Sequence, residues 1–586
     1  MRTPRRLWSL APVLAMLIGN CTSTEPEPEH PLASEAAAAF TESWTEGDFA
    51  SMADSLQDAS GRQWTPTRLE RYIGRQSERG RVTTYEVTVA GDVDEPDDAA
   101  FEDAEESDGE AVTVDVPYEI RYRSEAASHD VVLAGEVPLE FDAGEDEWIA
   151  EWDKGLLWPG ITGAASFDVA YRWPPRAAIL DRKGRRLAVG SAARRRYPFG
   201  SIGGSIVGHL EPLSRADAAE QELADVGDLV GGSGLEQGLN ERLAGQPASK
   251  LMVLDEGGDP VEVLGRTSAE RGEPVKTTLD IRVQRAAESA YGDTLGGVAL
   301  VDPATGGILA AVASGPFDPN NYVGVEGVNP FNRALVGLYP PGSAMKVVTA
   351  AAALEERVVT PSSTVTGPQE YKGVRNFESG VYDSIPFSSA VRYSVNTAFA
   401  QVAEDLGAKR MTRYAEAFGF NRTPDMPLEI AQSSFPQPEG LGDLMWASIG
   451  QAQVLSTPLQ MATVAATIAN RGKRMESRVE KDARPVGERA VSRRTAAQVA
   501  AMMEDVVVGG TGIAARIGGL RVAGKTGTAE VDVNGKRKEH AWFIAFAPVE
   551  EPVVAIAVVA ELGGVGGRVA APLARQILIS ALPHLR

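Results

Sequence analysis

The chain has 586 residues, of which 43% are hydrophobic and 24% are charged. This length exceeds what one hydrophobic core supports, so three or four domains are expected, and the composition is typical of folded domains rather than of wholesale disorder. A net charge of -24 argues against nucleic acid as a partner, because the sequence has no long basic run that could segregate positive charge.

Residues 1–21 have the pattern of an export signal. Basic residues between Arg2 and Arg6 precede an apolar run over residues 7–18, which is short for a membrane span. The segment Leu17-Ile18-Gly19-Asn20-Cys21 resembles a bacterial lipoprotein processing box, in which Cys21 becomes the lipidated first residue. An uncleaved anchor and plain secretion are the alternatives. All three place the rest of the chain outside the cytoplasm.

Cysteine and histidine usage argues against two further kinds of site. Cys21 is the only cysteine, so an internal disulfide is not available. The five histidines are scattered without the spacing of metal ligands. The sequence therefore predicts no metal and no cofactor.

The first part of the exported chain predicts a linker and a small α+β domain. Residues 22–32 are rich in Pro, Glu, Ser and Thr and predict an extended linker. Residues 33–160 predict a helix followed by a curved antiparallel sheet, since helical spacing gives way to period-two alternation. The helix is expected over residues 33–56 and the strands over residues 84–89, 112–122, 131–141 and 148–152.

An acidic stretch from Asp92 to Glu110 lies inside this domain and contains no Lys or Arg. It is too polar to become ordered by burying apolar surface, so it predicts a solvated loop. A calcium site is the alternative, but the fixed ligand spacing and the turn glycine of a calcium loop are absent.

Two further domains follow. Residues 161–278 are rich in turns and predict a β-rich domain, with a hairpin turn at Asp181-Arg182-Lys183-Gly184 between two apolar runs. Residues 279–586 begin at a helix that Asp280 can cap, and they predict an antiparallel sheet flanked by helices. The clearest elements are strands over residues 298–302, 308–312, 542–547 and 553–559 and a closing helix over residues 572–582.

Three short strings in the last domain carry the chemical signal. They are Ser343-Ala344-Met345-Lys346, Ser394-Val395-Asn396 and Lys525-Thr526-Gly527. Only 12 of the 57 basic residues are Lys, yet Lys stands in two of the three strings. Because Lys can lose its proton and act as a base whereas Arg cannot, these lysines are interpreted as chemical rather than structural.

The first string pairs a nucleophile with a base. Pro340-Pro341-Gly342 breaks the chain, after which Ser343 opens a nearly all-apolar helix expected over residues 344–354. The backbone amides at a helix start favour an oxyanion, and Lys346 lies one turn deeper on the same face. Burial and a second cation at Lys525 would hold Lys346 partly neutral, so that it can accept the hydroxyl proton. A Lys that only snorkels from a buried helix is the alternative.

The other two strings also have structural alternatives. Ser394 could cap a helix expected over residues 398–406, and Lys525-Thr526-Gly527 could form an exposed turn. His540 has the chemistry of a general base, although a packing role is favoured. The ordered set of all three strings is far less expected by accident than any one of them.

The three strings resemble the active-site motifs of penicillin-binding proteins and serine β-lactamases. The chain is more closely similar to a class B penicillin-binding protein of the low-affinity, methicillin-resistance type. That resemblance implies a transpeptidase fold for residues 279–586, a dimerisation or pedestal domain for residues 161–278 and an NTF2-like domain for residues 33–160. It rests outside the motifs on Trp152-Asp153, Trp158-Pro159-Gly160, the run from Pro175-Arg176 to Leu187, and Gly232-Ser233-Gly234-Leu235-Glu236.

The resemblance also implies a role for each motif residue. Ser343 would be the acylated nucleophile, Lys346 its base and Ser394 a proton relay, while Asn396 would bind the substrate peptide. Lys525, Thr526, Gly527 and Thr528 would hold the substrate carboxylate on an edge strand near residues 521–530. The backbone amides of Ser343 and Thr528 would form the oxyanion hole.

The implied reaction is D,D-transpeptidation of peptidoglycan stem peptides that end in D-Ala-D-Ala, with β-lactams as acylating mimics. A hydrolase, either a D,D-carboxypeptidase or a β-lactamase, shares all three motifs and stays open, as does a non-enzymatic β-lactam sensor or scaffold. A separate glycan polymerase is expected as a partner, and the protein is expected on the outer face of the bacterial plasma membrane, held by a lipid or an N-terminal anchor.

Overall fold

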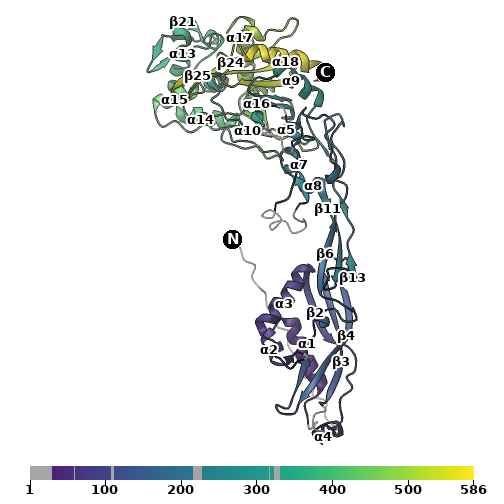
Figure 1. Cartoon of the computed structure of the whole chain (residues 1–586). Coiled ribbons are helices and arrows are strands. Elements are labelled where there is room, and N and C mark those ends of the chain that lie inside the picture. Colours follow the sequence, from purple (N-terminus) through teal and green to yellow (C-terminus); the bar gives the residue numbers. More distant parts are fainter. Residues whose placement is uncertain are drawn as a thin grey trace, which may run out of the picture. The chain divides into compact units, whose positions relative to one another are not determined.

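The computed structural model describes residues 30–58, 60–106, 111–214, 227–315, 317–322 and 330–585. The chain divides into two compact units (Figure 1). The first unit comprises Met1–Tyr171 with Ser249–Ser268, and the second comprises Arg172–Ala248 with Ala269–Arg586. The export segment and Cys21 lie outside the described residues. Of the helices in the ranges just given, none has both the length and the apolar character required to cross a membrane.

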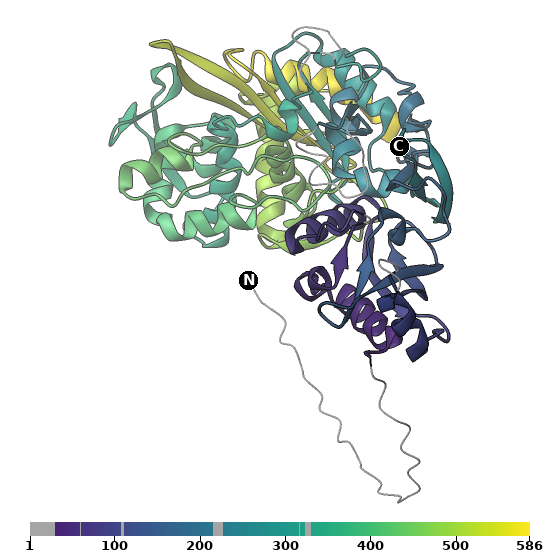
Figure 2. The same ribbon diagram turned by 60° about the horizontal axis from the view of Figure 1, so that its bottom comes forward.

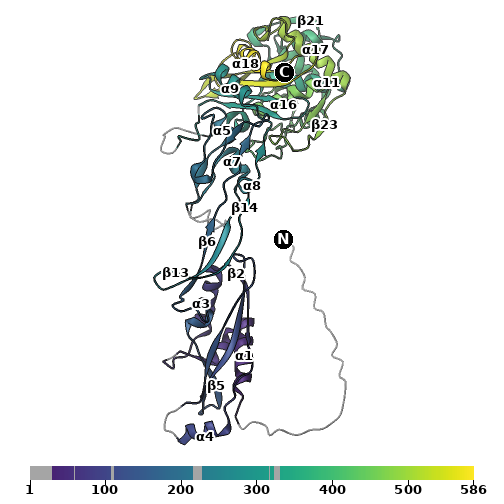
Figure 3. The same cartoon turned by 90° about the vertical axis from the view of Figure 1, so that its right-hand side faces the viewer.

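The first unit begins with these elements in chain order: α1 (Ala33–Glu46), α2 (Phe49–Asp54), β1 (Leu56–Gln57), α3 (Pro66–Arg79), β2 (Val82–Val89), α4 (Asp98–Glu106), β3 (Thr113–Ser124), β4 (Val131–Asp142), β5 (Glu147–Glu151) and the 3₁₀ turn η1 (Lys154–Leu157). The strands form one sheet in the order β1-β5-β4-β3-β2, antiparallel except for the β1–β5 pair. Helix α1 lies along this sheet (Figure 3), where the ring of Trp44 meets that of Tyr118 at 6.1 Å. The four predicted strands are present, with ends shifted by one or two residues.

Two expectations for this unit were wrong. The helix predicted over residues 33–56 is interrupted, because Gly47 takes a left-handed φ of 72° that ends α1, and Asp48 caps a separate α2. The acidic stretch predicted as a loop contains helix α4, because Phe101 is buried against Phe141, with the two ring centroids 5.0 Å apart. One aromatic side chain anchors a segment that its charge alone would leave solvated.

A second sheet completes the first unit. It has the order β13-β12-β6, with β6 at Ser166–Arg172, β12 at Ala248–Leu254 and β13 at Pro260–Arg266. Phe167, Leu251 and Val253 join the same hydrophobic core as α1 and the five-stranded sheet. Residues 249–268 therefore pack with the first unit although they are distant from it in sequence.

The second unit opens with short elements: β7 (Ile179–Leu180), β8 (Arg186–Ala188), η2 (Ala192–Arg194), α5 (Gly204–Val207), β9 (Leu210–Pro212), β10 (Leu229–Gly231), α7 (Gly234–Gly238), α8 (Asn240–Ala244), β11 (Gly245–Gln246), β14 (Glu270–Arg271) and β15 (Val275–Lys276). The predicted hairpin is confirmed, since β7 and β8 pair antiparallel across the turn at Gly184. Arg176 and Arg195 both donate to the buried carboxylate of Glu236, each at 2.7 Å. Such a buried network of hydrogen-bonded charges fixes the local geometry.

A five-stranded sheet flanked by helices forms the middle of the second unit, as predicted. Its elements are α9 (Ile281–Tyr291), β16 (Gly296–Val301), β17 (Ile308–Ala313), α16 (Pro458–Ala469), β24 (Ala523–Val533), β25 (Lys536–Ala547), β26 (Val554–Ala560) and α18 (Ala570–Leu585). The strand order is β17-β16-β26-β25-β24, antiparallel throughout. Asp280 caps α9 as expected, by accepting a hydrogen bond from the amide of Arg282.

Alternating residues of this sheet supply two separate cores. Val298, Leu300 and Ile556 pack with α9 and α18 on one face, whereas Ala299, Val301 and the odd residues of β26 pack with α16 on the other. Strand β24 lies at one edge of the sheet, and the β24–β25 hairpin extends from the rest of the unit (Figure 2).

The remaining elements are mostly helical: α10 (Arg333–Val336), η3 (Gly342–Met345), α11 (Lys346–Glu355), β18 (Thr364–Gly367), β19 (Glu370–Tyr371), β20 (Val374–Arg375), η4 (Phe377–Ser379), β21 (Tyr382–Pro386), α12 (Phe387–Arg392), α13 (Asn396–Leu406), α14 (Ala408–Ala417), α15 (Leu441–Ser448), β22 (Lys473–Met475), β23 (Gly487–Arg489), α17 (Arg493–Gly509) and η5 (Ile513–Ala515). Helix α11 is buried from Lys346 to Leu354, which agrees with its apolar sequence. It carries the first motif at its start.

Candidate active site

Ser343 lies in the tight turn η3 that leads into α11. The helix itself begins at Lys346, so the expectation that Ser343 opens it is corrected: the serine sits one 3₁₀ turn earlier. Gly342 has a left-handed φ of 54°, and a Cβ on it would come within 2.6 Å of the carbonyl oxygen of Thr528. The nucleophile turn therefore packs directly against strand β24.

Lys346 connects the first motif to the second. Its side chain is fully buried, and its Nζ lies 3.1 Å from the hydroxyl of Ser343 and 3.1 Å from the hydroxyl of Ser394. The same Nζ donates to the backbone carbonyl of Ser394 at 2.8 Å and to Oδ1 of Asn396 at 2.5 Å. One amine thus contacts every polar side chain of the first two motifs.

The second motif adopts a strained backbone. Ser394 has a left-handed φ of 58°, which a serine rarely adopts, and Val395 rather than Ser394 occupies the cap position of α13. The second motif therefore lies at the start of α13, as its helix-cap alternative expected, but no side-chain hydrogen bond caps the helix. In this conformation the Ser394 hydroxyl lies within hydrogen-bond distance of both lysines, at 3.1 Å from Nζ of Lys346 and 2.9 Å from Nζ of Lys525.

Asn396 has an amide orientation that its partners fix. Its Nδ2 donates to the carbonyl oxygen of Arg375 at 2.8 Å, so its Oδ1 is the atom that faces Lys346. The Arg375 carbonyl belongs to the short strand β20, which has no sequence signal of its own.

The third motif lies on the edge strand β24, as expected. Lys525 is fully buried and donates to the carbonyl oxygen of Thr526 at 3.0 Å. A Cβ on Gly527 would come within 2.7 Å of the carbonyl oxygen of Pro341, so only glycine permits this close approach. The hydroxyl of Thr528 accepts a hydrogen bond from the amide of Gly566 at 3.2 Å.

The two lysines titrate far below their usual range. Burial lowers the pKa of Lys346 well below 10.5, and the positive charge of Lys525 lowers it further. Burial lowers the pKa of Lys525 to about 7. Ser343 and Ser394, in contrast, are partly exposed. The two serine hydroxyl groups are therefore accessible to solvent, and the two amines, whose pKa values are lowered, are buried behind them.

The low pKa of Lys525 predicts a pH-dependent stability. Between about 7 and 10.5 the unfolded chain binds a proton at Lys525 that the folded chain lacks, so the free energy of unfolding rises with pH. We expect this lysine to contribute on the order of 1 kcal/mol per pH unit above neutrality. Urea unfolding at pH 7 and pH 9 measures this contribution. Between the two pH values the free energy of unfolding should rise more steeply for the wild type than for Lys525→Met. The same rise in both proteins would contradict the buried, uncharged state of Lys525.

Sequence reasoning missed contacts that come from residues outside the motifs. The ring of Phe399 lies 5.3 Å from Nζ of Lys346, and the hydroxyl of Thr511 lies 2.7 Å from that of Thr526. A Gly-Gly-Thr-Gly string around Thr511 was the available signal. His540 accepts a hydrogen bond from the amide of Leu562 and packs on the ring of Tyr339, in agreement with the packing role favoured from the sequence.

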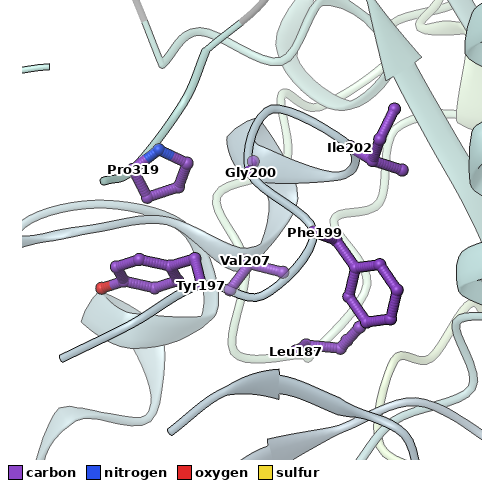
Figure 4. Close-up of a pocket in the computed structure, with 8 residues that line it drawn as sticks. Leu187, Tyr197, Phe199, Gly200, Ile202, Val207 and Pro319 are labelled. Carbon is purple, nitrogen blue, oxygen red and sulfur yellow. The ribbon is translucent and has the colours of Figure 1, made fainter. Parts of the chain in front are cut away.

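No metal cluster accompanies these groups in the described ranges, where three or more His, Cys, Asp or Glu side chains nowhere converge on one point. A small cavity of about 10 Å³ lies elsewhere in the second unit. Its apolar lining includes Leu187, Tyr197, Phe199 and Val207 (Figure 4). It holds at most one water molecule, and none of the motif residues lines it.

Comparison with known proteins agrees with this geometry. Residues 296–579 match the penicillin binding protein transpeptidase domain, and residues 188–277 match the penicillin-binding protein dimerisation domain. The peptidoglycan D,D-transpeptidase PbpA of Mycobacterium tuberculosis is 35% identical over 359 residues, which cover 53% of this chain and 73% of that relative. The chain belongs to the class B penicillin-binding protein family of D,D-transpeptidases. All three motifs of this penicillin-binding protein fall within the matched transpeptidase region.

Solved structures support the same family. The Pseudomonas aeruginosa PBP2, in complex with WCK 5153, aligns with a TM-score of 0.62 at 28% identity and covers 71% of this chain and 98% of its own. Penicillin-binding protein A of M. tuberculosis, as a ceftriaxone acyl-enzyme complex, aligns with a TM-score of 0.56 at 29% identity and covers 70% and 98%. The predicted multidomain α+β fold with a carboxy-terminal transpeptidase domain is confirmed for this penicillin-binding protein.

Proposed function

We propose that this penicillin-binding protein is a serine D,D-transpeptidase that cross-links peptidoglycan stem peptides and is acylated by β-lactams. The observation that carries the proposal is the position of one buried amine, Lys346, at 3.1 Å from the hydroxyls of both Ser343 and Ser394. The function of the relatives, which are named peptidoglycan D,D-transpeptidases, supports the same reaction.

The first step uses Lys346 as the base. A neutral lysine has two N–H groups and one lone pair. The carbonyl oxygen of Ser394 and Oδ1 of Asn396 only accept hydrogen bonds and take both N–H groups, which leaves the lone pair for a hydroxyl. Ser343 can therefore transfer its proton to Lys346 as its oxygen attacks the penultimate D-Ala carbonyl.

The second step returns that proton to the leaving group. Ser394 lies between the two amines, at 3.1 Å from Lys346 and 2.9 Å from Lys525, so its hydroxyl can relay a proton to the departing D-Ala nitrogen. The C–N bond breaks and leaves an ester on Ser343. The amine of a neighbouring stem peptide then attacks this ester, loses its proton to the same relay and restores the serine.

The remaining motif residues are proposed to hold the substrate. Asn396 would bind the donor peptide, and Thr526, Gly527 and Thr528 would hold its terminal carboxylate along the edge of β24. The amides of Ser343 and Thr528 would receive the oxyanion. The close packing of η3 on β24 supports this arrangement, because it brings the two amide-bearing segments together.

Several finer assignments are also proposed. The helix-covered sheet of the first unit supports an NTF2-like domain at residues 33–160. A pedestal at 161–278 and the transpeptidase domain at 279–586 are proposed from the sequence, with residues 249–268 of the pedestal packing against the first unit. The low-affinity, methicillin-resistance type follows from that domain order. The sequence of residues 1–21 supports a lipoprotein anchored through Cys21 on the outer face of the plasma membrane, with residues 22–32 as linker and a separate glycan polymerase as partner.

Product analysis tests the transferase directly. The full-length protein would be incubated with a peptide ending in D-Ala-D-Ala and an amine acceptor, and the products would be separated by mass. A cross-linked product that requires Ser343 is expected. If hydrolysis of the terminal D-Ala is the only reaction at every acceptor concentration, the protein is instead a D,D-carboxypeptidase.

A further inference from the structure

Two exposed side chains of opposite charge connect the two sides of the site. Nη2 of Arg568, in the turn before α18, lies 3.6 Å from Oε1 of Glu378, in η4. The two side chains are 76% and 68% exposed, so both charged groups are accessible to a ligand. Neither residue belongs to the three motifs, and neither takes part in the acylation of Ser343.

Glu378 lies on the side of the site that carries the second motif. It closely follows Arg375, whose carbonyl oxygen accepts the hydrogen bond that orients Asn396. The side-chain oxygen of Asn376 accepts a hydrogen bond from the amide of Thr397 at 3.0 Å. These hydrogen bonds fasten the segment that leads into Glu378 to the start of α13.

Arg568 lies on the side of the site that carries the third motif. The amide of Gly566 donates to the hydroxyl of Thr528 at 3.2 Å. A Cβ on Gly567 would lie 3.7 Å from Cγ2 of Thr526, so the turn before Arg568 packs on β24. The contact between Arg568 and Glu378 therefore runs from the third motif to the second.

The backbone at Glu378 is strained. Glu378 and Ser379 have left-handed φ angles of 51° and 57°, which two consecutive residues other than glycine rarely adopt. The amide of Gly380 donates to the carbonyl oxygen of Phe377 at 3.2 Å, and Nδ2 of Asn376 donates to the carbonyl oxygen of Gly380 at 2.9 Å. Because strain of this kind concentrates at functional sites, the turn is a candidate for ligand binding.

The surroundings of the Glu378 carboxylate suit a particular kind of cation. An ion pair between exposed side chains is weak, so a second cation can replace the Arg568 guanidinium. Phe377 and Val381, on either side of Glu378 in the sequence, are large apolar residues that are also exposed. An ammonium group at the end of an alkyl chain matches both features, because the charge pairs with the carboxylate while the methylene groups pack on apolar surface.

We propose that Glu378 captures the acceptor amine, as the ammonium group of an alkyl chain, in place of Arg568. The proposal rests on the transpeptidase function proposed above and adds a residue for the acceptor. The captured ammonium releases one proton to solvent at this exposed position and moves to the ester on Ser343. Its nitrogen then forms the C–N bond as the ester C–O bond breaks, and its second proton passes through Ser394 to the serine oxygen.

Two nucleophiles that differ in charge test the capture role. The amide of Nα-acetyl-lysine carries an ammonium group on an alkyl chain, whereas hydroxylamine is uncharged at neutral pH. Acyl transfer from a peptide ending in D-Ala-D-Ala would be measured against the concentration of each nucleophile with the full-length protein. Glu378→Gln is expected to raise the KM for the lysine derivative about fivefold relative to that for hydroxylamine, the upper range for an exposed ion pair. Glu378→Asp keeps the carboxylate and is expected to stay within about twofold of the wild-type ratio.

A matched variant and the wild type separate the possible failures. Glu488 also has an exposed carboxylate, which lies 3.5 Å from the guanidinium of Arg422 in the same unit, and Glu488→Gln is expected to keep the wild-type ratio of KM values. An unchanged ratio in Glu378→Gln, or an equal rise in KM for both nucleophiles, would overturn the capture role. A wild type that transfers its acyl group to neither nucleophile would instead refute the proposed function, since no KM could then be measured in any variant.

Discussion

Replacing Ser343 by alanine is expected to abolish covalent labelling by fluorescent penicillin. The substitution removes the only hydroxyl that lies on the nucleophile turn η3 and within 3.1 Å of the buried Lys346 amine. Because no ester can form without that oxygen, the loss is expected to exceed about a thousandfold, as for other residues that act at the reacting atom. Labelling followed by denaturing gel electrophoresis measures it.

The fold should survive this change. Ser343 is partly exposed, and within the described part of the chain its hydroxyl bonds to Lys346, only three residues away, so the thermal unfolding midpoint should stay near that of wild type. Ser362→Ala removes an exposed serine in the same unit and serves as the matched control with full labelling. Persistent labelling of the Ser343→Ala protein would remove Ser343 from its assigned role.

Replacing Lys346 by methionine is expected to slow acylation by about a hundredfold to ten-thousandfold, the usual contribution of a positioned base. Methionine has a similar length and no proton acceptor of comparable basicity. Lys346→Arg is expected to lose activity to the same degree, because a guanidinium cannot release its proton at neutral pH. The acylation rate constants of the Lys346→Met and Lys346→Arg proteins are measured with a chromogenic β-lactam.

Stability distinguishes this loss from a folding defect. The Lys346 amine is fully buried and its charged form is disfavoured, so methionine at this position should leave the unfolding midpoint unchanged or raise it. Lys409→Met, on the exposed surface of α14, is the matched control and should keep full acylation. Near-normal acylation in Lys346→Met would mean that another group accepts the serine proton.

The sequence predicted the parts of the fold that depend on pattern. The antiparallel strands β16, β17, β25 and β26 were expected because their apolar runs are long and uninterrupted, and the cap at Asp280 because a short polar side chain precedes the helix. The edge position of β24 followed from the family resemblance rather than from its own residues. In long segments with a strong hydrophobic pattern, the local sequence alone is enough to predict the secondary structure.

Other helix boundaries depend on single residues whose effect the sequence pattern does not predict. Gly47 splits the predicted first helix by adopting a left-handed backbone, although an isolated glycine is often tolerated in a helix. Phe101 anchors α4 by packing on the rings of His30, Phe141 and Trp148, which are distant from it in the sequence. The high negative charge of residues 92–110 therefore led to the wrong prediction of a loop in place of α4.

The site shows the same division. The motif residues were predicted, and the structure brings all three strings together around Lys346 and Lys525. The left-handed backbone of Ser394, the Arg375 carbonyl that orients Asn396 and the Thr511–Thr526 pair were not predicted. Each arises from tertiary packing between segments that are distant in the sequence, for which a single chain offers no periodic signal.

The pH dependence of acylation by benzylpenicillin tests the central claim most directly, because the account requires an amine beside Ser343 that has lost its proton near neutral pH. The lowered pKa of Lys346 and the pKa of Lys525 of about 7 predict a rate constant that stops rising by neutrality and then declines as Lys525 loses its proton. A rate constant that keeps rising about tenfold per pH unit toward pH 10, as an ordinary lysine base would give, would contradict it.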